Sequence, residues 1–214
     1  MEVLEMSELA RRLNQCKKPV GDQGKVVVDD MNERHYELTG WGLDKIKIDK
    51  AYKMLDIGCG GGRTVNRLSN AAEEGEVYGI DYSSDCVRWA SEYNKELIKE
   101  GRVHISEASV EKLPFEDNKF DVVTAVETIY FWPNVEENIK EVNRVLKKGG
   151  KFIIINEIYD DDKFRERNNE FAKNSNMKIY SPEKLKSLLK NAGYLNIEME
   201  IKEENNWICY VSEK

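Results

Sequence analysis

One stretch of sequence decides the fold: Leu55-Asp56-Ile57-Gly58-Cys59-Gly60-Gly61-Gly62-Arg63. It joins an apolar segment, predicted as a strand over residues 54–57, to a predicted helix over residues 63–72. In an open parallel sheet, ligands bind beyond the carboxyl ends of the strands, where such a turn lies. Glycines there let the backbone approach a ligand closely. Because three consecutive glycines exceed what a tight turn needs, we interpret the stretch as a ligand-binding loop.

The spacing of the glycines excludes two common phosphate-binding loops. The dinucleotide pattern GxGxxG needs its last glycine at position 63 or 65, depending on the register, and the chain has Arg63 and Val65 there. A P-loop needs Gly-Lys-Ser/Thr, which does not follow the stretch. What remains is an acid, Asp56, two residues before the pattern Gly-x-Gly-x-Gly.

Strands and helices alternate after this loop, which predicts a parallel sheet with helices on both faces. Further strands are predicted at 76–80, 103–106, 120–126 and 152–155. Helices are predicted at 84–99 and after Pro133, and Gly149-Gly150 is expected to end the second of these. The last two strands, 196–202 and 207–212, are four residues apart, too few for a crossover, and must form an antiparallel hairpin.

The segments outside this alternation are expected to be accessory. Helices are predicted at 2–17 and 30–38, with a loop holding Pro19, Gly21 and Gly24 between them. We therefore divide the chain into an N-terminal helical accessory or lid segment, residues 1–50, and a main domain, residues 51–214. The polar stretch 156–180 is a long connection, and such connections are usually functional or disordered. We interpret it as a lid insertion.

Composition limits the classes of partner. The 214 residues carry a net charge of -7, whereas nucleic-acid binders usually show a basic face. No apolar run is long enough to span a membrane, and the acidic N-terminus is unlike a signal peptide. We therefore expect a cytoplasmic protein that binds neither nucleic acid nor membrane. No metal site is expected, because the four cysteines form no CxxC pair and the chain has only two histidines.

Five motifs, in order, resemble those of the class I S-adenosylmethionine (SAM)-dependent methyltransferases. They are the glycine stretch and the segments 77–82, 107–115, 120–127 and 141–150. The group most resembled is the ubiquinone/menaquinone-type, or type 11, methyltransferases. The resemblance implies a Rossmann-like, doubly wound α/β fold. Its seven-stranded sheet would be mostly parallel with an antiparallel C-terminal hairpin, in the order 3-2-1-4-5-7-6, with SAM as cofactor and S-adenosylhomocysteine as product.

The same resemblance assigns cofactor contacts. Asp56 would contact the amino acid part of SAM, and Asp81 would accept hydrogen bonds from the ribose hydroxyls. A helix-capping role for Asp81 is the alternative. The chain has Ser109 where the family often has an aspartate for the adenine amino group, and a hydroxyl can also accept that bond. The complete predicted set is Asp56, Gly58, Cys59, Gly60, Gly62, Asp81, Tyr82, Ser109, Val110 and Val126.

Catalytic residues are harder to locate, because in-line methyl transfer needs a base only if the acceptor must lose a proton. The candidates are Glu127 and Tyr130, after the fourth predicted strand, and His35 in the accessory segment. The aromatic run 130–132 would either face a flat or apolar acceptor or pack the next helix. His35, Tyr36 and Trp41 would form the opposite wall.

The sequence therefore favours an enzyme that methylates a small molecule, aromatic or apolar. Two alternatives stay open: a SAM-binding module without catalysis, such as a sensor, and an RNA or protein methyltransferase. The glycine spacing speaks against a nicotinamide dehydrogenase. A homodimer is also left open.

Overall fold

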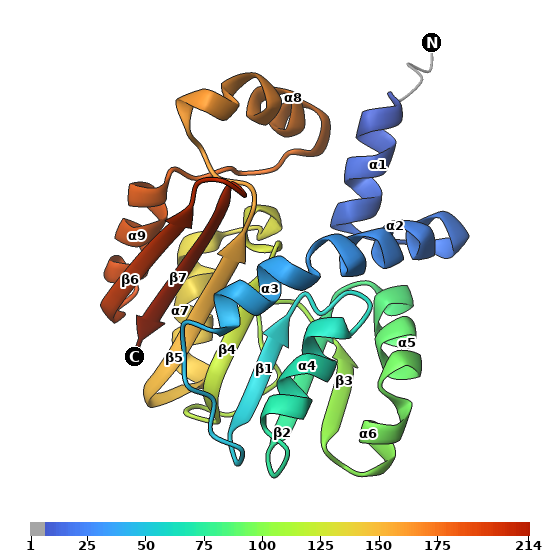
Figure 1. Ribbon diagram of the computed structural model, residues 1–214, viewed down its shortest axis with the longest axis vertical. Coiled ribbons are helices and arrows are strands. Elements are labelled where there is room, and N and C mark those ends of the chain that lie inside the picture. The colour runs from blue at the N-terminus through green and yellow to red at the C-terminus, as the bar shows by residue number, and fades with distance from the viewer. Residues whose placement is uncertain (1–6) are drawn as a thin grey trace.

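The computed structural model describes residues 7–214, which form one seven-stranded sheet flanked by helices (Figure 1). The strands lie in the order β3-β2-β1-β4-β5-β7-β6. Neighbours among β1 to β5 pair in parallel, and β7 is antiparallel to both β5 and β6. The predicted fold class and strand order are confirmed. The bounds are β1 Lys53–Ile57, β2 Glu76–Asp81, β3 Val103–Glu107, β4 Phe120–Val126, β5 Leu146–Asn156, β6 Leu195–Lys202 and β7 Trp207–Glu213.

Helices cover both faces of this sheet because both faces are apolar. Met54 and Leu55 are adjacent on β1 and both fully buried, but they belong to different clusters, since side chains alternate along a strand. The cluster around Leu55 includes residues of α7 and α9, and the cluster around Met54 includes residues of α3, α4 and α5. The helices that follow the strands are α4 Arg63–Ala71, α5 Ser84–Tyr93, α6 Lys95–Lys99, α7 Val135–Val145 and α9 Pro182–Asn191.

Of the remaining helices, α1, α2 and α8 lie beyond the carboxyl ends of the parallel strands, and α3 packs on one face of the sheet against β5 and β7 (Figure 1). The first helix, α1, packs against α8, and the hydroxyl of Ser7 donates to Asn174 Oδ1 at 3.1 Å. The two accessory parts of the chain, before β1 and after β5, thus meet above the sheet. None of the described helices is long and apolar enough to cross a bilayer. These elements are α1 Glu8–Lys17, α2 Gly21–Arg34, α3 Tyr36–Leu43 and α8 Arg165–Ser175, with short 3-10 turns at Ile129–Phe131 and Asp162–Phe164.

The predicted loop through Gly21 and Gly24 is wrong, because both glycines belong to α2. A Cβ at Gly24 would lie 2.9 Å from the carbonyl carbon of Pro19, so this glycine permits a close turn between α1 and α2. The predicted helix over 30–38 is divided between α2 and α3, which meet at His35. The predicted first helix begins at Glu8 in the described chain, and its residues 2–6 lie outside the described residues.

The prediction that Gly149-Gly150 ends a helix is also wrong. Helix α7 ends at Val145, and the glycines lie inside β5. The pairing of β4 with β5 shifts register there, from Phe120 opposite Leu146 to Val122 opposite Lys151. Gly149 has φ 76°, a conformation that favours glycine. The two glycines therefore allow the irregularity in β5, although the sequence pattern at this point is typical of a helix end.

Candidate functional site

The glycine loop, residues 58–62, is held by hydrogen bonds to the neighbouring strand. The amides of Gly58 and Cys59 both donate to the carbonyl of Ile80, at 2.8 and 2.9 Å. Gly58, Gly60 and Gly62 have φ of 75°, 52° and 82°, in the left-handed region that favours glycine. At Gly58 a Cβ would also lie 2.5 Å from the side-chain methyl carbon of Thr128. Glycine is therefore required here both for the backbone and for packing.

Asp81 joins the glycine loop to the helix that follows β2. Its carboxylate accepts the amides of Gly60 at 3.0 Å and Ser83 at 2.9 Å. Burial raises the pKa of Asp81, and the backbone hydrogen bonds partly offset that effect. The N-cap of α5 is Ser83, whose hydroxyl accepts the amide of Cys86. Asp81 also lines the main cavity, so its carboxylate can contact a bound ligand while it holds the glycine loop in place.

Asp56, at the end of β1, is a second buried carboxylate beside the loop. It is 2% exposed, and the hydroxyl of Thr124 on β4 donates to its Oδ1 at 2.6 Å. Burial raises the pKa of Asp56 to about 7, against the opposing effect of this hydrogen bond. An ionised carboxylate in such surroundings favours a cationic neighbour.

Tyr82 and Ser109 are both committed to hydrogen bonds within the protein. The hydroxyl of Tyr82 donates to the carbonyl of Lys17, which ties the end of α1 to β2. The hydroxyl of Ser109 accepts the amide of Glu111 and donates to its carboxylate, each at 3.2 Å. Both residues line the cavity. Their polar atoms shape its wall, and the ammonium of Lys18 lies over the ring of Tyr82, 5.2 Å from its centroid.

The cavity is about 530 Å³ in volume and opens between the glycine loop and the helices above it. Nine of the ten predicted cofactor residues line it; Gly62 does not. A Cβ at Gly62 would lie 2.8 Å from Cα of Ala90, so Gly62 allows α4 and α5 to approach each other. Trp41, predicted as a wall residue, packs instead on Trp207, with ring centroids 5.9 Å apart.

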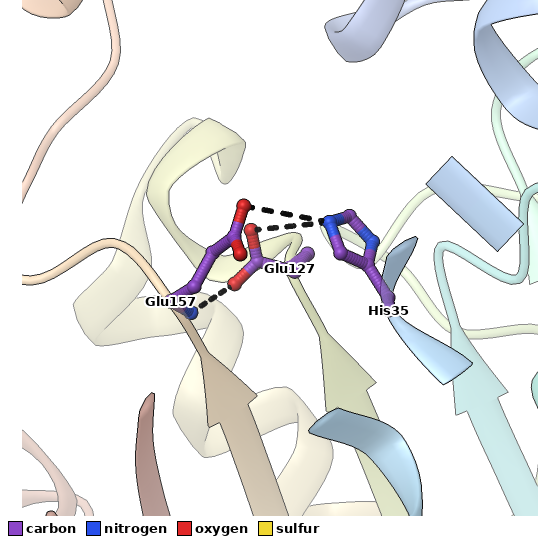
Figure 2. A group of neighbouring side chains, drawn as sticks. All are labelled: His35, Glu127 and Glu157. Atoms are coloured by element: carbon purple, nitrogen blue, oxygen red, sulfur yellow. Dashed lines mark hydrogen bonds and ion pairs between the residues drawn. The ribbon is translucent and has the colours of Figure 1, made fainter. Parts of the chain in front are cut away.

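Three side chains converge at the wall of the cavity, and we call them the carboxylate cluster: His35, Glu127 and Glu157 (Figure 2). His35 Nε2 lies 3.6 Å from Glu157 Oε1 and 4.0 Å from Glu127 Oε2. The amide of Glu157 donates to the carboxylate of Glu127. The two glutamates meet because β4 and β5 pair with Val126 opposite Ile155, so both follow the ends of adjacent strands.

Burial and mutual charge set the protonation of the cluster. Burial raises the pKa of Glu127, and Glu157 adds to the rise, while His35 opposes it. The pKa of Glu157 is lowered by its interaction with His35, with burial opposing. Burial lowers the pKa of His35, but the two glutamates raise it by more, so the net shift of the His35 pKa is upward. Two acids and an imidazole are thus held in strong electrostatic contact at the cavity wall.

The aromatic run 130–132 divides between the two roles expected for it. Trp132 is 5% exposed and lies parallel to Phe152, with centroids 6.2 Å apart, so it also packs the core. The hydroxyl of Tyr130 donates to Glu127 Oε2 at 2.7 Å, and burial raises the pKa of Tyr130. This hydroxyl is committed to orienting Glu127. All three residues contribute atoms to the cavity wall.

Sequence reasoning missed several residues of the site. Glu157 was placed only within a polar stretch, and no local motif marks it. Other missed lining residues come from α2, α4 and the segment after α8, and they are Met31, Asn32, Thr64, Arg67, Asn176 and Lys178. Nothing in the sequence indicates that these segments meet, because their approach depends on how the accessory helices pack.

Comparison with known sequences identifies a domain. Residues 55–154 match the model of the methyltransferase domain family. A demethylmenaquinone methyltransferase from Staphylococcus carnosus is 32% identical over 114 residues, which are 53% of this chain and 46% of that protein. The matched region spans less than half the length of the first curated relatives. The predicted resemblance, to the class and to its menaquinone-type members, is confirmed.

Solved structures share the fold over most of the chain. A chain from a complex with the Haloferax volcanii Trm112 methyltransferase activator has a TM-score of 0.75 at 17% identity and covers 96% of this chain and 97% of that chain. Phosphoethanolamine N-methyltransferase 2 of Haemonchus contortus, solved with SAM, has a TM-score of 0.70 at 18% identity and covers 84% and 52%. At these identities the likeness establishes the fold.

Proposed function

We propose that this chain, whose residues 55–154 match the methyltransferase domain family, is a SAM-dependent enzyme that methylates a small molecule bound in the cavity. The observation that carries the proposal is the cavity itself. It runs from the glycine loop to the carboxylate cluster and has the volume typical of small-molecule sites. Helices α1 to α3 contribute to its wall.

The residues around the glycine loop fit SAM. The loop presents glycine backbone to the cavity, and Asp56 and Asp81 supply carboxylates at the ends of adjacent strands. Asp56 would face the ammonium group of the methionine part, which also compensates its burial. Asp81 would accept hydrogen bonds from the ribose hydroxyls. Adenine would lie by Tyr82, Ser109 and Val110.

The acceptor would occupy the opposite part of the cavity, between the carboxylate cluster and the aromatic run 130–132. These aromatic walls support the aromatic or apolar acceptor expected from the sequence. When bound, SAM supplies a methyl group on a sulfonium. The protein holds the acceptor atom in line with the methyl carbon and sulfur and excludes water. The acceptor–carbon bond forms as the carbon–sulfur bond breaks, and S-adenosylhomocysteine leaves.

The experiment that tests this proposal is calorimetric titration of the protein with SAM and with S-adenosylhomocysteine. We expect micromolar binding of both. Asp81→Ala should weaken it at least about thirtyfold, because hydrogen bonds to a charged group contribute about 1.5–3 kcal/mol each. The matched control is Asp44→Ala, which removes an exposed carboxylate beyond α3. Absence of binding by the folded wild-type protein would overturn the proposal.

Turnover separates the enzyme from the alternatives. A screen of small aromatic and apolar acceptors, with release of S-adenosylhomocysteine as the readout, should yield a substrate. Tight SAM binding with no turnover on any small-molecule pool, or turnover only on RNA or protein, would contradict the small-molecule assignment.

A further inference from the structure

The carboxylate cluster has the composition of a divalent metal site. It offers one imidazole nitrogen and two carboxylate oxygens, from three different elements, all within 4.8 Å of one another (Figure 2). The cysteines and histidines alone predict no metal site. Carboxylates complete the ligand set here: the pairing of β4 with β5 brings the two glutamates together, and the packing of the helices before β1 adds His35.

The distances in the cluster suit an ion better than direct hydrogen bonds. His35 Nε2 lies 3.6 Å from Glu157 Oε1 and 4.0 Å from Glu127 Oε2, both beyond the usual 2.7–3.2 Å. A zinc ion lies about 2.1 Å from each ligand, so two ligands on one ion are about 3–4 Å apart. The cluster therefore needs movements of less than about 1 Å to close around an ion.

The ligands are already oriented by a second set of contacts. Glu127 accepts the hydroxyl of Tyr130 on one oxygen and the amide of Glu157 on the other. Its backbone has φ 56°, an uncommon conformation for a side-chain-bearing residue, which places the carboxylate at the end of β4 toward His35. Such outer hydrogen bonds are typical of carboxylates that bind metals.

Two cations act on the cluster: Arg167 through space on both glutamates, and Arg34, which pairs directly with Glu157 and can leave it at little cost. Arg34 Nη2 lies 3.0 Å from Glu157 Oε1, while its Nη1 lies 3.8 Å from Asp30 Oδ2. The Arg34 side chain is 50% exposed, so the pair with Glu157 is weak and Asp30 is a ready alternative partner. The other two ligand side chains, His35 and Glu127, are 15% and 7% exposed.

We propose that His35, Glu127 and Glu157 bind a divalent transition-metal ion at the cavity wall. Mixed imidazole and carboxylate ligands suit Mn²⁺ and Zn²⁺. Three protein ligands leave an open position, and two of the three, His35 and Glu127, line the cavity. That position takes an oxygen of the ligand in the cavity.

The role of this oxygen rests on the proposed function. A hydroxyl or phenol of the acceptor, bound to the ion, loses its proton to solvent more readily. Its oxygen then forms the bond to the methyl carbon as the carbon–sulfur bond breaks. The ion site thus selects acceptors with an oxygen donor next to the aromatic wall.

The test uses metal ions alone and needs no acceptor. The protein is stripped with EDTA, desalted and titrated with Mn²⁺, followed by electron paramagnetic resonance, and with Zn²⁺ by calorimetry. Because Cys16 also lines the cavity and thiolate binds zinc, the zinc titration is repeated in Cys16→Ser. We expect one ion per chain in both proteins, with zinc the tighter.

Two variants and one matched control decide the assignment. His35→Ala and Glu157→Gln should each weaken Mn²⁺ binding at least about tenfold. His104→Ala removes a histidine from an exposed pair, with Nε2 3.3 Å from Glu76 Oε2, and should leave binding unchanged. No bound ion, or equal affinity in wild type and both variants, would overturn the site. Thermal unfolding of each variant confirms that it is folded.

The same proteins separate this inference from the proposed function. SAM titration of His35→Ala should give the wild-type affinity, because His35 is outside the cofactor set. Ion binding without SAM binding would overturn the methyltransferase assignment and leave the metal site. SAM binding without ion binding would overturn the metal site alone.

Discussion

The glycine loop and the carboxylate cluster both contribute to the wall of one cavity but are built in different ways. The loop is five consecutive residues whose backbone bonds to the adjacent strand at Ile80 and Asp81. The cluster consists of side chains from the α2–α3 junction and the ends of β4 and β5. A ligand surface made of local backbone leaves a sequence pattern, and a surface made of converging side chains does not. Their responses to substitution should differ accordingly.

The largest effect is expected in the glycine loop, at Gly62→Ala. The residue has φ 82°, and a Cβ would lie 2.8 Å from Cα of Ala90. Left-handed backbone costs about 1–2 kcal/mol and overpacking about 1–3 kcal/mol, so unfolding in urea should show a loss of about 2–5 kcal/mol. The control is Gly60→Ala, where φ is 52° and no atom lies within 4 Å of the new Cβ. Equal losses at both positions would contradict the packing role.

A smaller and pH-dependent effect is expected at Asp56→Asn. Burial raises the pKa of Asp56 to about 7 from 3.8, so the folded state favours the protonated form. The stability this provides is complete below pH 3.8 and is lost as the pH rises through about 7. The amide does not titrate and should be more stable than wild type at pH 8, by about 1–3 kcal/mol.

Urea unfolding at pH 5, 7 and 8 checks this expectation. The advantage of Asp56→Asn should grow with pH and level off above neutrality. SAM binding should weaken in the same variant, since the ammonium group of the ligand loses its counter-charge. If Asp56→Asn is less stable than wild type at pH 8, the protein itself stabilises the ionised Asp56 carboxylate in the absence of a ligand, and the expectation is wrong.

The smallest effect on stability is expected at the edge of the carboxylate cluster, at Arg34→Ala. Its ion pair with Glu157 is half-exposed, and such pairs contribute at most about 1 kcal/mol. Stability should therefore change little, while Mn²⁺ affinity should rise because Glu157 loses a competing partner. Arg88→Ala is the matched control, because Arg88 forms a similarly half-exposed pair, with its Nη2 2.8 Å from Asp85 Oδ1. Equal Mn²⁺ affinity in both variants would contradict competition at Glu157.

The errors in the sequence predictions have a common physical cause. The sequence pattern predicts breaks in regular structure at both Gly24 and Gly149, yet one allows a close contact between helices and the other a strand irregularity. Glycine permits both kinds of backbone, and the neighbouring segment selects between them. Trp41 was similarly expected at the cavity, but it packs on Trp207, which lies at the other end of the chain.

The sequence by itself determined the alternation of strands and helices, the antiparallel C-terminal hairpin, the position of the glycine loop and the acids beside it, while the strand order came from the resemblance to the class I methyltransferases. Alternating apolar segments, consecutive glycines and the acids at strand ends are local patterns, and parallel topology follows from them. Only the tertiary structure decided which side chains meet across the cavity. His35, Glu127 and Glu157 approach one another because β4 pairs with β5 and the helices before β1 fold over both. Such contacts depend on packing between distant segments, which no local pattern encodes.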